Sequence, residues 1–263
     1  MPRWQRLVLS PDQVVQGLEQ GRVCLAPEQR HYLTHVLRLR AGDVFLAIAQ
    51  QDGQWWQMSL SDDLRVGMIC GKIANLRELA LDVQLAIALP KSAVMDQIIP
   101  AVTQLGVRRV IPLYSDRTIW QPKQPLNSHK LQRWQRLAAE ASELSLRCLV
   151  PQICPPLTFQ QFMRHCTSPY RLIAVTQPAI HLLTLWQRQF PLALPAETQQ
   201  ITIATGCEGG WTEAEMALAE QNGFMAVSLG DRILSASTAP VVALAIINAV
   251  TESYAPSAVH PPA

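Results

Sequence analysis

Residues 201–211 read ITIATGCEGGW, a strand-like apolar run followed by a loop that contains three glycines. Glycine adopts positive φ angles without steric cost and lets backbone amides approach a ligand closely. Thr212 and Glu215 follow in the T-x-x-E spacing of a capping box, which predicts that a helix begins there. A strand, a glycine-rich loop and a helix N-terminus in this order are typical of a nucleotide-binding site, and an ordinary structural turn explains the loop equally well.

A second stretch with the same character lies shortly afterwards, where residues 226–240 read AVSLGDRILSASTAP. Gly230 follows the strand-like run and allows close backbone approach, while Thr238 and Pro240 are typical of a helix start. Arg232 is the only lysine or arginine in the last quarter of the chain. This isolation makes Arg232 a candidate for a specific electrostatic role.

The rest of the chain from about residue 78 alternates strand-like and helix-like patterns. This alternation predicts a parallel sheet with helices on both faces. Ligands of such sheets bind outside the carboxyl ends of the strands, so the loops after residues 89, 175, 204 and 229 are the segments where we expect a site. The expected strands are 81–89, 107–114, 171–175, 201–204 and 226–229, and the expected helices are 94–105, 129–147, 180–190, 212–222 and 240–252.

The first 77 residues have a different pattern, which predicts a small β-rich domain. Expected strands at 3–9, 44–48 and 55–60 flank an expected helix at 27–39, and the pair Asp52-Gly53 is a hairpin signal. Short strands joined by tight turns favour a small barrel. We therefore expect two domains, at residues 1–77 and 78–263.

Composition bounds the class of protein. Apolar residues make up 49% of the 263 residues and charged residues 16%, which predicts a packed globular core. No apolar run has the length of a membrane span, and the first residues lack the apolar core of a signal peptide, so we expect a cytoplasmic protein without membrane contact. The six cysteines show no metal-ligand spacing, which favours reduced thiols and no metal.

The net charge is a weaker indicator of the protein's binding partners. A net charge of +2 does not by itself indicate nucleic acid, but most of the 22 basic residues are arginine, whose planar fork suits phosphate groups. Several arginines lie in the first forty residues, where a basic RNA-binding face and ordinary surface charge explain them equally well.

The order of these motifs resembles the SPOUT methyltransferases and, within them, the ribosomal RNA small-subunit methyltransferase E family. Residues 31–43 (HYLTHVLRLRAGD) are similar to the HxxxVLR…GD segment of that family, and residues 208–210 (EGG) and 229–234 (LGDRIL) are similar to its two ligand loops. Further matches lie between these segments, at Lys91, Met95-Asp96, Leu105-Gly106-Val107, Arg133-Trp134, Glu140-Ala141 and Arg147. Several motifs in the family's order make a chance match improbable.

The resemblance implies a SPOUT-type trefoil-knotted parallel sheet with helices on both faces, preceded by a PUA-like RNA-binding β-barrel domain. It also implies a homodimer. The activity that it implies is methylation of N3 of a uridine in 16S rRNA, with S-adenosyl-L-methionine as cofactor and 16S rRNA or the small ribosomal subunit as partner.

The same resemblance assigns the site residues. Arg232 and Glu208 are the catalytic candidates. Arg232 would hold the uracil anion or a phosphate, with a dimer-interface role as the alternative. Glu208 would order its loop, contact the cofactor or accept a proton, and the first of these roles is favoured. The expected cofactor-binding residues are Val175, Thr205, Gly206, Glu208, Gly209, Gly210, Leu229, Gly230, Ile233, Leu234 and Ala239. The expected RNA-binding residues are His31, His35, Arg38, Arg40 and Lys91.

The chain departs from the family at polar positions near the expected site. Cys207 replaces a proline, Ser235 and Ser237 replace an arginine and a glutamate, and Ala101 replaces a lysine. These losses keep two alternatives open. One is a non-catalytic RNA-binding or ribosome-assembly protein on a SPOUT scaffold, and the other is a SPOUT methyltransferase with a different RNA target.

Overall fold

The computed structural model describes residues 6–49, 55–73, 78–91, 93–119, 128–147, 149–189 and 200–254. Within these residues the chain forms two compact units, of which the first comprises residues 6–78 and 142–150 and the second comprises 79–141 and 151–254. The expected Asp52-Gly53 turn and Cys148 lie outside the described residues. Each unit has its own sheet and its own core.

The first unit is built on a five-stranded sheet in the order β1-β3-β4-β5-β2. β1 pairs with β3 in parallel, and the remaining neighbours pair antiparallel. Its core includes Leu9, Phe45, Trp56 and Met58, none of which has measurable exposure. The strands are β1 (Arg6–Leu9), β2 (Arg22–Cys24), β3 (Val44–Ala49), β4 (Trp55–Leu60) and β5 (Val66–Ile73).

The helical segments of this unit differ from the expectation. α1 (Pro11–Gln20) was not predicted, although Ser10 and Gln13 form a capping box at its start and Gly21 ends it with a φ of 66°. The expected helix at 27–39 is two shorter pieces, α2 (Pro27–His31) and a π-helical turn η1 (Tyr32–Val36). Arg38, which follows this turn, has a φ of 58° that ends the helical path.

The second unit contains an eight-stranded sheet in which every described pairing is parallel. The path runs β11-β13-β10-β12-β6-β7-β8, with β9 paired to β7. This confirms the predicted α/β fold with a parallel sheet. The strands are β6 (Asp82–Ala88), β7 (Arg109–Tyr114), β8 (Gln152–Ile153), β9 (Leu157–Thr158), β10 (Tyr170–Val175), β11 (Ile180–His181), β12 (Gln200–Thr205) and β13 (Met225–Ser228).

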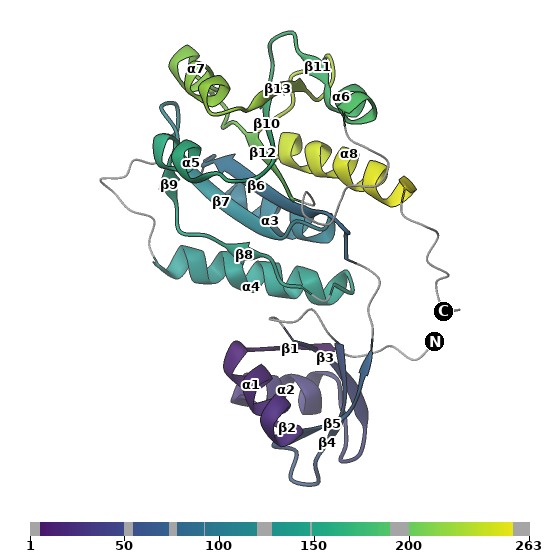
Figure 1. Cartoon of the computed structure of the whole chain (residues 1–263). Coiled ribbons are helices and arrows are strands. Elements are labelled where there is room, and N and C mark those ends of the chain that lie inside the picture. Colours follow the sequence, from purple (N-terminus) through teal and green to yellow (C-terminus); the bar gives the residue numbers. More distant parts are fainter. Residues whose placement is uncertain are drawn as a thin grey trace. The chain divides into compact units, whose positions relative to one another are not determined.

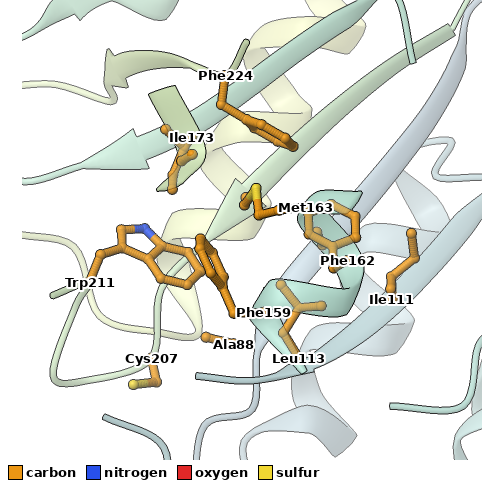
Figure 2. Packing of buried hydrophobic residues seen from close by; sticks show 13 residues of the cluster. Ala88, Ile111, Leu113, Phe159, Phe162, Met163, Ile173, Cys207, Trp211 and Phe224 are labelled. Carbon is orange, nitrogen blue, oxygen red and sulfur yellow. The ribbon is translucent and has the colours of Figure 1, made fainter. Parts of the chain in front are cut away.

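Helices pack against this sheet from two sides (Figure 1). Aromatic side chains of α5 meet small strand residues and α7 in one apolar cluster, which Figure 2 shows around Phe159, Phe162 and Trp211. α8 packs instead against α3, α6 and β12. The helices are α3 (Met95–Gln104), α4 (Ser128–Leu144), α5 (Phe159–His165), α6 (Leu182–Gln189), α7 (Glu213–Gln221) and α8 (Thr238–Tyr254).

Two of the motifs that carried the family resemblance join α3 to α4. Asp96 accepts hydrogen bonds through Oδ1 from Trp134 Nε1 at 3.0 Å and through Oδ2 from Arg133 Nε at 3.1 Å. The MD and RW motifs therefore position helices in the second unit. None of the helices in the part of the chain that the structure describes has the length and apolar character needed to span a membrane.

Candidate functional site

The loops that follow β7, β10, β12 and β13 meet at one edge of the second unit's sheet, because all four strands run in parallel. They line a pocket of about 150 Å³. Most of the residues that sequence predicted to bind cofactor lie on its wall, together with Arg232: Val175, Gly206, Gly209, Gly210, Leu229, Gly230, Ile233, Leu234 and Ala239. Segments separated by more than fifty residues are therefore brought together.

The glycine-rich loop after β12 is held in a tight turn. The Gly210 N–H donates to the Cys207 carbonyl at 3.0 Å, and Gly210 has a φ of 67°, in the left-handed region that favours glycine. A Cβ on Gly206 would lie 3.3 Å from the Gly210 Cα, so the two glycines approach each other closely. This compact turn leaves backbone atoms on the wall of the pocket.

Trp211 anchors the end of the same loop. Its Nε1 donates to the Ala174 carbonyl at 3.1 Å, which ties the loop to the carboxyl end of β10. Its ring packs on Phe159 with the ring centroids 5.1 Å apart, as Figure 2 shows. One residue thus connects the glycine-rich loop to both the sheet and the apolar core.

The loop after β13 is ordered by hydroxyl groups. Ser228 Oγ accepts from the Gly230 N–H and donates to the Gly230 carbonyl, both at 3.1 Å. Ser235 Oγ lies 2.8 Å from Ser237 Oγ and 2.9 Å from Thr238 Oγ1, and it accepts from the Thr238 N–H at 3.2 Å. Ser235 and Ser237 therefore lie just before the start of α8, and neither brings a charge to this part of the loop.

The charged residues on the pocket wall are few. Arg232 is exposed, and neither it nor Asp231 makes an ion pair with a residue that the structure describes. Arg117 is also exposed, and its Nη1 donates to the Gly209 carbonyl at 2.6 Å. The pocket therefore carries two guanidinium groups and one carboxylate among its described lining residues.

Two predicted cofactor residues do not line the pocket. Thr205 is fully buried, and its Oγ1 has no hydrogen-bond partner within the described residues. Glu208 is exposed, and its Oε1 accepts from the Lys91 backbone N–H at 3.2 Å. This contact links the glycine-rich loop to the loop after β6, so the observed contact of Glu208 orders its loop.

The residues predicted to bind RNA lie apart from the pocket in sequence and are all exposed. His31, His35, Arg38 and Arg40 belong to the first unit, where the rings of His31 and His35 stack with centroids 4.6 Å apart. Lys91 belongs to the second unit. Ala101, the position of the missing lysine, is half-buried on α3.

The sequence did not identify Arg117, Thr176, Gln177, Trp211 or Asp231 as pocket residues. Arg117 had a detectable signal, because it follows a strand that was correctly placed in the parallel sheet. The loop after that strand is nevertheless not among the loops where the sequence predicts a site. Thr176 and Gln177 directly follow Val175, Trp211 directly follows Gly210, and Asp231 lies within the LGDRIL segment.

No group of histidine, cysteine, aspartate or glutamate suited to a metal ion occurs within the residues described. Five cysteines in those residues are free thiols, and burial raises the pKa of the Cys154 thiol. Cys207 lines the pocket, and its Sγ donates to the Arg117 carbonyl at 3.4 Å.

Comparison with known proteins places the chain in a family. The model of the RNA methyltransferase domain family matches residues 77–248. The ribosomal RNA small subunit methyltransferase E of Synechocystis sp. is 42% identical over 252 residues, which cover 94% of this chain and 78% of that protein. The Bacillus subtilis protein of the same name is 29% identical, covering 86% of this chain and 89% of that protein.

A solved structure agrees with these relatives. The ribosomal RNA small subunit methyltransferase E of Neisseria gonorrhoeae, bound to S-adenosyl methionine, superposes with a TM-score of 0.78 at 26% identity. The alignment covers 94% of this chain and 98% of that one. The chain belongs to the ribosomal RNA small subunit methyltransferase E family of RNA methyltransferases.

Proposed function

We propose that the protein transfers a methyl group from S-adenosyl-L-methionine to N3 of a uridine in the 16S rRNA of the small ribosomal subunit. The observation that carries this proposal is the pocket at the carboxyl ends of the strands, built from the predicted glycine-rich and LGDRIL loops. The relatives' names support an rRNA substrate and the Neisseria structure supports the cofactor.

The pocket residues fit such a cofactor. Gly206, Gly209 and Gly210 offer backbone groups, which suit the polar edges of an adenosine. Ile233, a residue that is 85% exposed, and its neighbour Leu234 offer apolar surface that a flat ring can cover. The bound sulfonium would supply an activated methyl group, so the protein's contribution is positioning and exclusion of water.

Arg232 is the residue that we assign to the charge developed in the reaction. Uracil N3 carries a proton, and its removal leaves a negative charge that a nearby cation stabilises. Arg232 lines the pocket with a guanidinium that has no ion pair among the described residues, so its charge is available to a substrate. No histidine is found among the described lining residues, and we assign no general base.

The first unit would bind RNA through its exposed basic residues. His31, His35, Arg38 and Arg40 lie within or just after the α2–η1 segment, and a π-helical turn and a positive φ at a non-glycine residue occur more often at functional sites than elsewhere. Lys91 would add a contact from the second unit. The PUA-like character of the first unit, the trefoil knot and the cytoplasmic location stay predictions from the resemblance and the sequence.

A second candidate is an RNA-binding protein of this fold that does not catalyse methyl transfer. It is favoured by the uncharged Ser235–Ser237–Thr238 hydroxyl cluster, which stands where the family has an arginine and a glutamate. A third candidate is a methyltransferase of this fold that acts on another RNA target, and the same measurements test it.

Two measurements separate these candidates. Calorimetry of the purified chain with S-adenosyl-L-methionine should show one site per chain. Mass-spectrometric mapping of 16S rRNA, from cells with and without the gene, should show the loss of one N3-methyluridine. Cofactor binding with unchanged rRNA modification would favour the non-catalytic protein, while loss of a methyl group from another RNA would favour the different target.

A further inference from the structure

We propose that Arg117 binds a phosphate of the RNA strand that enters the pocket, and that the backbone of Gly209 holds Arg117 in position. This inference rests on the proposed function, because the phosphate belongs to the RNA substrate. Arg117 follows β7 and Arg232 follows β13, so two separate loops each supply one guanidinium to the same pocket.

The Arg117 side chain lies across the glycine-rich loop. Its Nη1 donates to the Gly209 carbonyl at 2.6 Å, a short charge-assisted contact. The Arg117 carbonyl in turn accepts from Cys207 Sγ at 3.4 Å. These contacts hold the Arg117 backbone and one edge of its guanidinium, and the other N–H donors of the group remain for a ligand.

The charge of the two arginines is not compensated by the protein. Neither makes an ion pair with a described residue, although Asp231 lines the same pocket. Two like charges on the wall of one pocket repel each other, and an anionic ligand in the pocket lowers that cost. Both side chains are exposed, which suits a polyanionic strand arriving from solvent.

Gly209 explains how Arg117 is positioned. The φ of Gly209 lies outside the left-handed range, so its backbone does not require glycine. A Cβ at this residue would instead lie 2.9 Å from the Arg117 Cβ and 3.2 Å from its Cδ. The missing side chain is therefore space that the Arg117 stem occupies, and a substitution at Gly209 should displace Arg117.

The test uses the full chain with four variants: Arg117→Ala, Arg117→Lys, Gly209→Ala and the double variant Arg117→Ala/Gly209→Ala. Affinity for 16S rRNA is measured over a range of salt concentrations, and affinity for S-adenosyl-L-methionine is measured by calorimetry. Arg136→Ala is the matched control, because Arg136 is an exposed arginine of the same unit that pairs with Glu140 at 3.4 Å.

Arg117→Ala should weaken rRNA binding and lower the slope of log affinity against log salt by about 0.7–0.9, the loss of one phosphate contact. Arg117→Lys should retain the slope, since it keeps the charge. Gly209→Ala should reproduce the effect of Arg117→Ala, and the double variant should lose no more than either single variant. Arg136→Ala should leave the slope unchanged, and cofactor affinity should change less than about twofold in Arg117→Ala.

An unchanged salt slope in Arg117→Ala would overturn the inference, as would additive losses in the double variant. Loss of cofactor affinity without loss of rRNA affinity would also overturn it, since Arg117 would then serve the cofactor alone. RNA binding is measured without turnover. A chain that binds rRNA through Arg117 but never methylates it would therefore support this inference and contradict the proposed function.

Discussion

At the scale of single residues, Gly210 shows how a left-handed backbone conformation shapes the pocket. Its φ is 67°, and a Cβ added there would meet nothing within 4 Å, so a substitution acts through the backbone alone. Gly210→Ala should lower the free energy of unfolding by about 1 kcal/mol, because the left-handed conformation disfavours a side chain. It should also weaken S-adenosyl-L-methionine binding, since the residue lines the pocket.

Gly42 is the matched control for this prediction. It has a φ of 83° and equally open surroundings, but it lies in the first unit. Gly42→Ala should cost similar stability in thermal unfolding and leave cofactor affinity unchanged. Equal cofactor affinity of the unaltered chain, Gly210→Ala and Gly42→Ala would show that the Gly210 turn does not contact the cofactor.

Arg232 is the residue that tests the chemistry. If its guanidinium stabilises the uracil anion, Arg232→Ala should lower kcat and kcat/KM together by roughly 10²–10³, with little change in cofactor affinity. Arg232→Lys should recover part of the rate, because it keeps the charge but loses the planar fork. A rise in KM at constant kcat, measured by methyl transfer to small ribosomal subunits, would assign Arg232 to phosphate binding alone.

At the scale of helices and strands, the parallel sheet was the most predictable part. Apolar runs such as those at β6, β10 and β12 are buried on both faces, so they stand out in the sequence. α1 and α5 were missed although Ser10 and Thr158 each form a capping box, because short helices show few turns of periodicity. The interruption after His31 could not be predicted, since a π-helical turn has no distinct apolar spacing.

The residues that the sequence singled out and that line the pocket lie mostly in the two loops that carry glycines. The contributions of Arg117 and Trp211 come from packing between loops, which no local pattern reveals. Arg147 shows the reverse case, a motif residue whose observed role is structural. It forms a buried ion pair with Glu78, in which Nη2 lies 2.8 Å from Oε2, and the Glu78 carboxylate also accepts from the Leu149 N–H at 3.0 Å.

This ion pair gives a prediction for the stability of the first unit. The side chain of Arg147 is 3% exposed and that of Glu78 is 13% exposed, so removing one partner leaves a charge that water barely reaches. Arg147→Ala should therefore cost about 3 kcal/mol of unfolding free energy. Arg136→Ala, at an exposed pair with side chains 69% and 58% exposed, should cost under about 0.5 kcal/mol. Equal losses in denaturant unfolding would contradict the role given to burial.

At the scale of the whole molecule, the pocket depends on the order of strands in the sheet. β13 and β12 flank β10, so two loops that are neighbours in sequence reach the pocket from either side of a third. The loop after β7 joins them from farther along the same edge. Each loop can be recognised separately from the sequence. Which loops lie opposite one another in the pocket follows only from the order of the strands in the sheet.

The last prediction is that two copies of the chain associate through α8. Within one chain, Ala243, Leu244, Ile247 and Val250 of this helix are buried, whereas Ala245 and Ala249 are exposed. Small exposed residues beside the half-buried Val242 and Ile246 would allow another apolar surface to approach closely. A stable homodimer interface buries on the order of 2,000 Å² or more, so sedimentation at micromolar concentration should show a dimer.

Ala245→Arg should shift that dimer toward monomer, because it places a bulky charge on the proposed contact. Ala217→Arg is the matched control, since Ala217 is an exposed alanine on α7. It should leave the sedimentation coefficient unchanged. If the unaltered chain sediments as a monomer, the predicted dimer is wrong. If it is a dimer that Ala245→Arg does not weaken, the interface lies on another face. Neither result affects the assignment of the pocket, which lies within one chain.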